Sequence, residues 1–153
     1  MPEASLLTQD VRDLIGVPAP MDPVTVTQRA VRRAVEVFTA RRSRDYADGE
    51  SVPGYALAAL DSESEPPSLP SLLPQGLLIS NEWQFERPLR MGEQLTVAYR
   101  IVDISERFGG KFGYSIDFRS EREFRDSTGA VVARSAHSMM QYDASQASDG
   151  GEP

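Results

Sequence analysis

The sequence predicts an α+β fold in which one amphipathic helix packs against a curled antiparallel sheet. Two observations predict it: apolar residues recur at helical spacing between residues 26 and 42, and they alternate with polar residues over much of 77–142. A helix stripe and a sheet face must each be buried, and packing them together buries both. The chain has 153 residues, which fits one domain, because domains typically hold ~100–200 residues.

The helix is predicted over residues 26–42. Thr25 is a suitable N-cap, and Gln28 three residues later completes a capping-box pattern. The apolar stripe consists of Ala30, Val31, Ala34, Val35 and Phe38. We expect this stripe to face the sheet and the arginine-rich side of the helix to face water. Residues 53–60 are apolar and rich in alanine, and they predict a second, short helix.

The second half of the chain is predicted to form four strands in an antiparallel meander. Apolar and polar residues alternate within each strand, and turn signals containing glycine or proline separate the strands. The alternation places these large residues on one face: Trp83, Phe85, Leu95, Val97, Tyr99, Ile101, Tyr114, Ile116 and Phe118. We expect the sheet to curl around the helix and to enclose Phe38 in the core.

The other segments are predicted to be irregular. Residues 1–24 form a lead-in, apart from a short helical turn within residues 6–15. Residues 61–74 are rich in proline and serine and predict a mobile insertion. Residues 143–153 are polar and glycine-rich, and they predict a disordered tail. The single domain is therefore predicted to span residues 1–142.

Composition narrows the functions that the chain can have. The formal net charge of −7 argues against nucleic-acid binding, which usually requires a basic footprint. There is no cysteine, so disulfides, thiolate catalysis and cysteine-based zinc sites are excluded. Glycine motifs for phosphates and spacings typical of metal ligands are missing too, so no cofactor or metal is predicted. The N-terminus has no export signal and the apolar runs are too short for a bilayer, so we expect a soluble, cytoplasmic protein.

One segment resembles a known family. Residues 81–95 read NEWQFERPLRMGEQL, which is similar to the aromatic–x–aromatic and R-P-L-x-x-G-(D/E)-x-L signature of the MaoC-like dehydratases, in particular their FAS1-like N-terminal domain. The resemblance extends more weakly over residues 12–142. It implies the hotdog fold, in which a curled antiparallel sheet wraps a long central helix. It also implies a ligand that is an acyl thioester of coenzyme A or of an acyl carrier protein.

The catalytic motif of that family is missing. MaoC-like enzymes carry D-x-N-P-x-H after the hotdog helix, where the carboxylate and the imidazole activate a water for addition to, or loss from, an α,β-double bond. Here the corresponding residues 39–51 read TARRSRDYADGES. They include Asp45 and Asp48 but no histidine, asparagine or proline. The only histidine, His137, lies in the last predicted strand.

The candidate site residues follow from this resemblance and from the chemistry of the side chains. Asp45, Asp48 and His137 are the weak candidates for catalysis. The substrate-binding candidates are Trp83, Arg87, Arg90 and Gly92, all within or beside the R-P-L segment. A cluster of arginines could contact coenzyme A phosphates or could be a solvated surface: Arg29, Arg32, Arg33, Arg41, Arg42 and Arg44.

Three functional hypotheses remain open on the sequence. The leading one is a non-catalytic subunit that binds an acyl thioester and pairs with a second hotdog chain carrying D-x-N-P-x-H. Together the two chains would form an enoyl-thioester hydratase or dehydratase. The alternatives are a stand-alone hydratase or thioesterase that uses Asp45 or Asp48, and a homodimeric acyl-binding module with no reaction. Whether this chain is an enzyme by itself therefore stays open.

Overall fold

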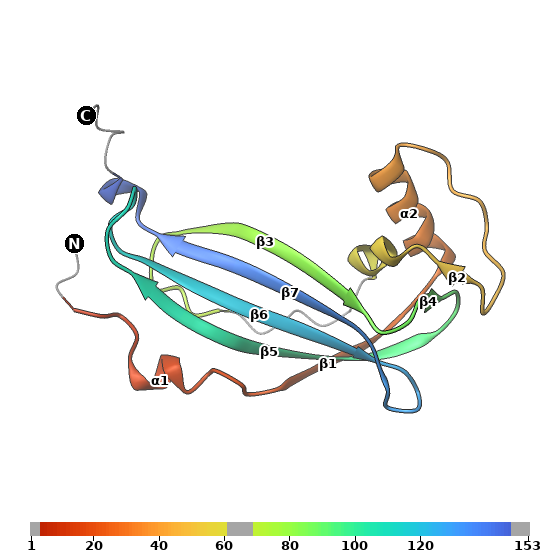
Figure 1. Ribbon diagram of the computed structural model, residues 1–153, viewed down its shortest axis with the longest axis horizontal. Helices are drawn as coiled ribbons and strands as arrows, with labels where there is room; N and C mark the ends of the chain where they lie inside the picture. The colour runs from red at the N-terminus through yellow and green to blue at the C-terminus, as the bar shows by residue number, and fades with distance from the viewer. Residues whose placement is uncertain (1–3, 61–68, 148–153) are drawn as a thin grey trace.

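A computed structural model of the chain describes residues 4–60 and 69–147. The main element is a long, curled five-stranded antiparallel sheet, and helix α2 (Gln28–Thr39) lies at one end of it (Figure 1). The predicted insertion at 61–74 and the predicted tail at 143–153 lie partly outside the described residues. Of the insertion, Leu72 and Leu73 donate backbone N–H bonds of 2.9 and 3.3 Å to Oε1 of Gln141.

The sheet has the strand order β1-β5-β6-β7-β3. Its strands are β1 (Ala19–Thr25), β3 (Gln75–Phe85), β5 (Gln94–Arg107), β6 (Ser115–Arg125) and β7 (Val131–Tyr142). A second, two-stranded sheet joins β2 (Ser51–Val52) to β4 (Leu89–Arg90). The remaining elements are α1 (Gln9–Arg12) and two 3-10 turns, η1 (Gly54–Ala59) and η2 (Ala144–Gln146).

The prediction of a simple meander was wrong in two respects. Strand β3 pairs with β7 instead of β5, because alternation assigns the face of a residue and says nothing of the neighbouring strand. Strand β1 lies in the segment predicted to be irregular. It contains Pro20 and Pro23, and its register with β5 shifts between Met21 and Val24. Proline is tolerated in a strand at the edge of a sheet, where no neighbour needs its missing N–H.

Helix α2 is shorter than predicted and begins later. Its N-cap is Thr27, whose hydroxyl accepts a bond of 3.1 Å from the Ala30 amide, whereas Thr25 is the last residue of β1. Gln28 does not complete a capping box. Its side-chain amide instead pairs with both backbone groups of Tyr46, and this pair fixes the loop that follows the helix.

The core occupies one face of the sheet, here called the inner face. It carries Leu95, Val97 and Phe124, which pack against the α2 residues Val31 and Val35. Farther along the same face, a second cluster is covered by the N-terminal segment and by residues 69–73. This cluster contains Leu7, Val11, Tyr99, Ile101, Ile104, Tyr114, Ile116 and Phe118. The two clusters lie toward opposite ends of the inner face.

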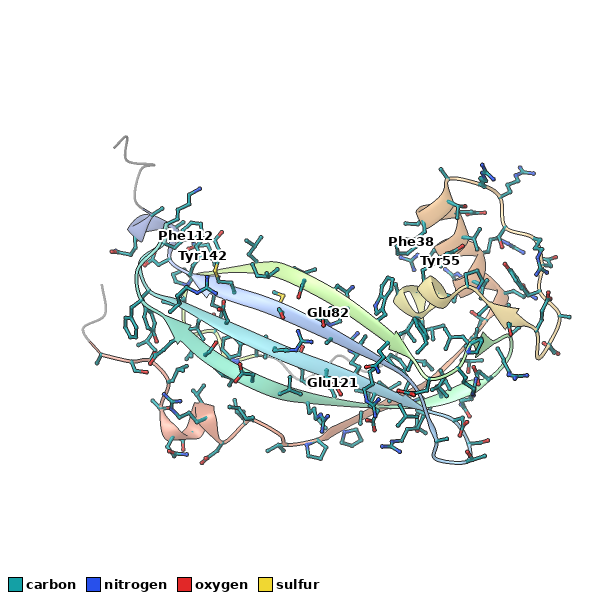
Figure 2. All side chains as sticks on the ribbon, viewed as in Figure 1. Phe38, Tyr55, Glu82, Phe112, Glu121 and Tyr142 are labelled. Atoms are coloured by element: carbon teal, nitrogen blue, oxygen red, sulfur yellow. The ribbon has the colours of Figure 1, made fainter. Side chains whose placement is uncertain are left out.

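Phe38 does not lie in the core, contrary to the prediction. The helix covers one end of the sheet, so its last turn extends past the strands and leaves Phe38 52% exposed. The ring stacks on Tyr55 of η1 at 5.1 Å between centroids (Figure 2), and it meets Trp83 edge-on at 6.0 Å. The predicted stripe is correct from Ala30 to Val35.

The opposite, outer face of the sheet is covered by ion pairs. Glu82 of β3 pairs with Arg119 of β6 at 2.6 Å, and Glu121 of β6 pairs with Arg100 of β5 at 3.1 Å; both carboxylates are marked in Figure 2. Arg134 of β7 adds contacts to neighbouring glutamates. The outer face is therefore polar and balanced in charge along its length.

Candidate functional site

The R-P-L-x-x-G segment forms a compact turn between β3 and β5. Leu89 is fully buried, and Gly92 adopts a φ of 85°, which a residue with a side chain rarely tolerates. The carboxylate of Glu93 accepts bonds of 3.1 and 2.7 Å from the Arg87 guanidinium and one of 2.7 Å from the Arg90 amide. Four residues of the signature therefore support this turn: Arg87, Leu89, Gly92 and Glu93.

Arg87 pairs with two carboxylates of the protein. Besides Glu93 it reaches Asp126 of the β6–β7 hairpin at 3.4 Å. Hydrogen bonding to Glu93, and then to Asp126, raises the pKa of Arg87 above its usual value. Arg90 and Gly92 are exposed on this turn. A role for the three in substrate binding stays a prediction.

The loop after α2 does not assemble a catalytic pair. Asp45 points to solvent, with its side chain 78% exposed, and pairs with Arg32 at 3.0 Å. Asp48 is also exposed and lies beside Gly92. The carboxylate that holds this loop is Glu50, whose pKa is lowered by its bond to Arg44 and then by the Ala47 amide.

His137 lies elsewhere, in the middle of the inner face. It stands opposite Ser120 of β6 and Asn81 of β3. Burial, and then the nearby charge of Arg122, lowers the pKa of His137 below its usual value, so the imidazole is neutral at pH 7. Within residues 4–60 and 69–147, no carboxylate forms a hydrogen bond with His137, so the three catalytic candidates are not brought together.

Three polar residues next to His137 were not among the predicted site residues: Ser120, Arg122 and Ser135. Arg122 of β6 stands directly opposite Ser135 of β7, and Ser120 stands opposite His137. Cross-strand partners project from the same face, so the four side chains form one group between the two apolar clusters. The sequence pattern indicates two of these residues, because Ser120 and Arg122 occupy the positions of β6 that continue the apolar alternation of Ile116 and Phe118.

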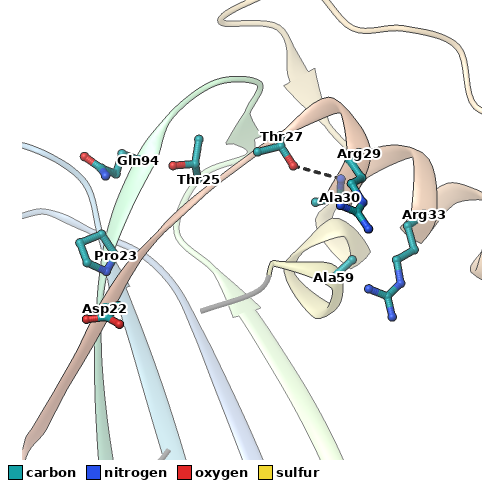
Figure 3. A pocket seen from close by; sticks show the side chains of 9 residues that line it. All are labelled: Asp22, Pro23, Thr25, Thr27, Arg29, Ala30, Arg33, Ala59 and Gln94. Atoms are coloured by element: carbon teal, nitrogen blue, oxygen red, sulfur yellow. Dashed lines mark hydrogen bonds between the residues drawn. The ribbon is translucent and has the colours of Figure 1, made fainter. Parts of the chain in front are cut away.

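A separate pocket of about 650 Å³ lies between β1 and the start of α2 (Figure 3). Arg29 and Arg33 of α2 form one wall, and Asp22 and Thr25 of β1 contribute to the other. Two members of the predicted arginine cluster therefore line a pocket. Arg32 and Arg44 pair with Asp45 and Glu50 on the surface.

Comparison with solved structures identifies the fold. A chain of the ChsH1–ChsH2 complex from Mycobacterium tuberculosis superposes with a TM-score of 0.67 at 14% identity, over 89% of this chain and 98% of that one. A MaoC-like dehydratase from Rhodospirillum rubrum gives 0.59 at 19% identity, over 86% and 94%. A chain of the C-terminally truncated HadBC (3R-hydroxyacyl-ACP dehydratase) complex from M. tuberculosis gives 0.58 at 15% identity, over 84% and 97%.

The chain therefore has the hotdog fold, in the form found in MaoC-like dehydratase structures. This confirms the predicted fold class and the resemblance at the level of fold. No protein-family model and no curated protein matches the sequence. Among the described residues, no helix is long and apolar enough to cross a membrane, and no group of three or more acidic or histidine side chains could hold a metal ion.

Proposed function

We propose that the protein is a non-catalytic MaoC-like subunit that binds an acyl thioester and pairs with a second hotdog chain. That second chain carries the D-x-N-P-x-H motif and performs hydration or dehydration. The observation that carries the proposal is the separation of the catalytic candidates. Asp45 and Asp48 face solvent on a loop at the end of the sheet, whereas the neutral His137 lies in the middle of the inner face.

The fold favours pairing through β3. This edge strand runs from Gln75 to Phe85 without a proline, and it exposes Leu77, Leu78 and Ile79. A long apolar edge with free backbone groups is suited to accept a strand from another chain. Two of the similar structures are complexes, ChsH1–ChsH2 and HadBC. The exposed edge supports pairing with another hotdog chain, the two complexes support a heteromer, and a homodimer would use the same edge.

The pocket beside α2 is the proposed site for the carrier end of the thioester. The guanidinium groups of Arg29 and Arg33 are suited to phosphate oxygens, which coenzyme A and the phosphopantetheine arm of a carrier protein both possess. Replacing Arg29 with Gln is expected to weaken coenzyme A binding, measured by calorimetry. Arg41→Gln, an arginine just beyond the helix, is the matched control and should leave binding unchanged.

Enoyl-CoA hydration tests the proposal. The pure protein should turn over crotonyl-CoA and longer enoyl-CoA substrates poorly or not at all, because general acid–base catalysis contributes ~10²–10⁴-fold and its histidine is missing. Addition of a hotdog partner that carries D-x-N-P-x-H should restore turnover. Robust hydration by the pure chain that disappears in Asp45→Asn, Asp48→Asn or His137→Ala would contradict the proposal and support a stand-alone enzyme.

A further inference from the structure

Arg122 differs from the arginines on the outer face of the same sheet. There, Arg100, Arg119 and Arg134 each contact a glutamate at 2.6–3.3 Å. Arg122 is on the inner face, between the two apolar clusters. Its Nε is excluded from solvent, and among the described residues it has no hydrogen-bond partner. A donor left in this state costs free energy, and a native protein that retains one usually has a use for it.

The neighbours of Arg122 offer it no compensating charge. Across the strands on the inner face it is paired with Tyr99 of β5 and Ser135 of β7. The acidic residue at the far end of this face, Glu106, accepts bonds from Tyr114 and Ser5. Within the described part of the inner face, the cation therefore has no carboxylate of the protein beside it.

The residues next to Arg122 supply further hydrogen-bond donors. Ser135 stands opposite it, and His137 and Ser120 form the adjacent cross-strand pair. Partners across an antiparallel sheet have Cβ atoms ~4.5–5.5 Å apart and diagonal neighbours ~7–8 Å, so one small group can meet all four side chains. Two hydroxyls, a neutral imidazole and a guanidinium can each donate, and a planar carboxylate is the group that best accepts such a set.

We propose that Arg122, Ser120, Ser135 and His137 bind a carboxylate of a ligand that lies on the inner face. This assignment rests on the proposed function and specifies the substrate class of that function. The acyl group carries a carboxylate remote from the thioester, as in the thioester of a dicarboxylic acid. The apolar clusters on either side contact the carbon chain. An acyl group with a simple alkyl end would leave the Nε of Arg122 without a hydrogen-bond partner among the described residues.

Short free acids test the carboxylate site independently of any thioester or catalytic partner. Octanoate and octanamide have the same chain length, and only octanoate has a carboxylate. Calorimetry should show octanoate binding about 10-fold to 100-fold more tightly, the range given by a hydrogen bond to a charged group. Arg122→Gln should abolish this preference. Arg119→Gln, on the outer face of the same strand, is the matched control and should retain it.

His137 gives a second measurement, because it is the only histidine in the chain and yields one imidazole signal by NMR. A bound carboxylate should raise its pKa by opposing the influence of Arg122, the charged residue nearest to it on the described inner face. Octanoate should shift this titration in the wild type and in Arg119→Gln, but not in Arg122→Gln. Equal affinity for octanoate and octanamide, or a His137 titration unchanged by octanoate, would overturn the inference.

The two proposals can fail separately. Loss of the preference for octanoate over octanamide leaves thioester binding through Arg29 and Arg33 untouched. Hydration by the pure chain, conversely, contradicts the non-catalytic role and leaves the carboxylate measurement unchanged. A thermal unfolding curve for each variant establishes that a loss of binding is not a loss of the fold.

Discussion

Replacing Arg122 with Met is expected to stabilise the ligand-free protein. Methionine retains the length and flexibility of the arginine stem, and it removes a donor that is buried without a partner among the described residues. A buried unsatisfied donor costs ~1–3 kcal/mol, so the free energy of unfolding should rise by about that amount. For a domain of this size each kcal/mol corresponds to ~2–4 °C in Tm.

Chemical denaturation followed by tryptophan fluorescence can measure this change, because Trp83 is the single tryptophan and contacts the main core. Protein concentration must be held constant, since association contributes to apparent stability. Arg119→Met is the control: it removes a surface ion pair worth ~0–1 kcal/mol and should be neutral or slightly destabilising. A loss of more than about 1 kcal/mol in Arg122→Met would refute the reasoning, because the guanidinium would then be contributing to the fold.

Three further predictions follow from the fold. Phe38→Ala should cost about 0.5–1.5 kcal/mol, the range for exposed aromatic pairs, whereas Leu95→Ala in the buried cluster should cost ~2–5 kcal/mol; equal losses by denaturation would place Phe38 in the core after all. The lowered pKa of His137 means that the unfolded chain binds its proton more readily, so stability should fall as pH drops below ~6.5, and His137→Gln should flatten that part of the curve. Ile79→Lys on β3 should weaken association in light scattering, whereas Val37→Lys, on the exposed side of α2, should not; equal effects would exclude pairing through β3.

Alternation in the sequence was sufficient to predict the strands β3, β5, β6 and β7 of the sheet. Tyr99, Ile116 and Phe118 are all buried where the two-residue period places them. The period could not predict that β3 joins the sheet beside β7, because the same faces would be buried in either order. Strand β1 escaped notice because Pro20 interrupts a pattern that an edge strand is free to interrupt.

The candidate site was predicted less well than the fold. Asp45, Asp48 and His137 were chosen for their chemistry, and only the fold could separate the loop from the middle of the sheet. Phe38 continues the apolar stripe of the helix in the sequence. It is nevertheless half exposed, because the last turn of α2 extends past the strands that cover the rest of the stripe. The alternation in β6 indicates Arg122, because this cation occupies a position where the two-residue period predicts an apolar side chain. The lack of a partner for its Nε among the described residues is visible only in the folded structure.

The two edge strands of the sheet differ in their ability to pair with a strand from another chain. Strand β3 can accept a further strand, whereas prolines and a shifted register interrupt the backbone of β1 at the other edge. An assembly that grows by edge pairing needs two competent edges on every unit to continue. This chain has one such edge. When two chains pair through β3, the strands left at the two outer edges are both β1, which prolines interrupt. If chains pair through β3 as proposed, the sheet ends at a pair and avoids the open-ended polymerisation to which long exposed strands are prone.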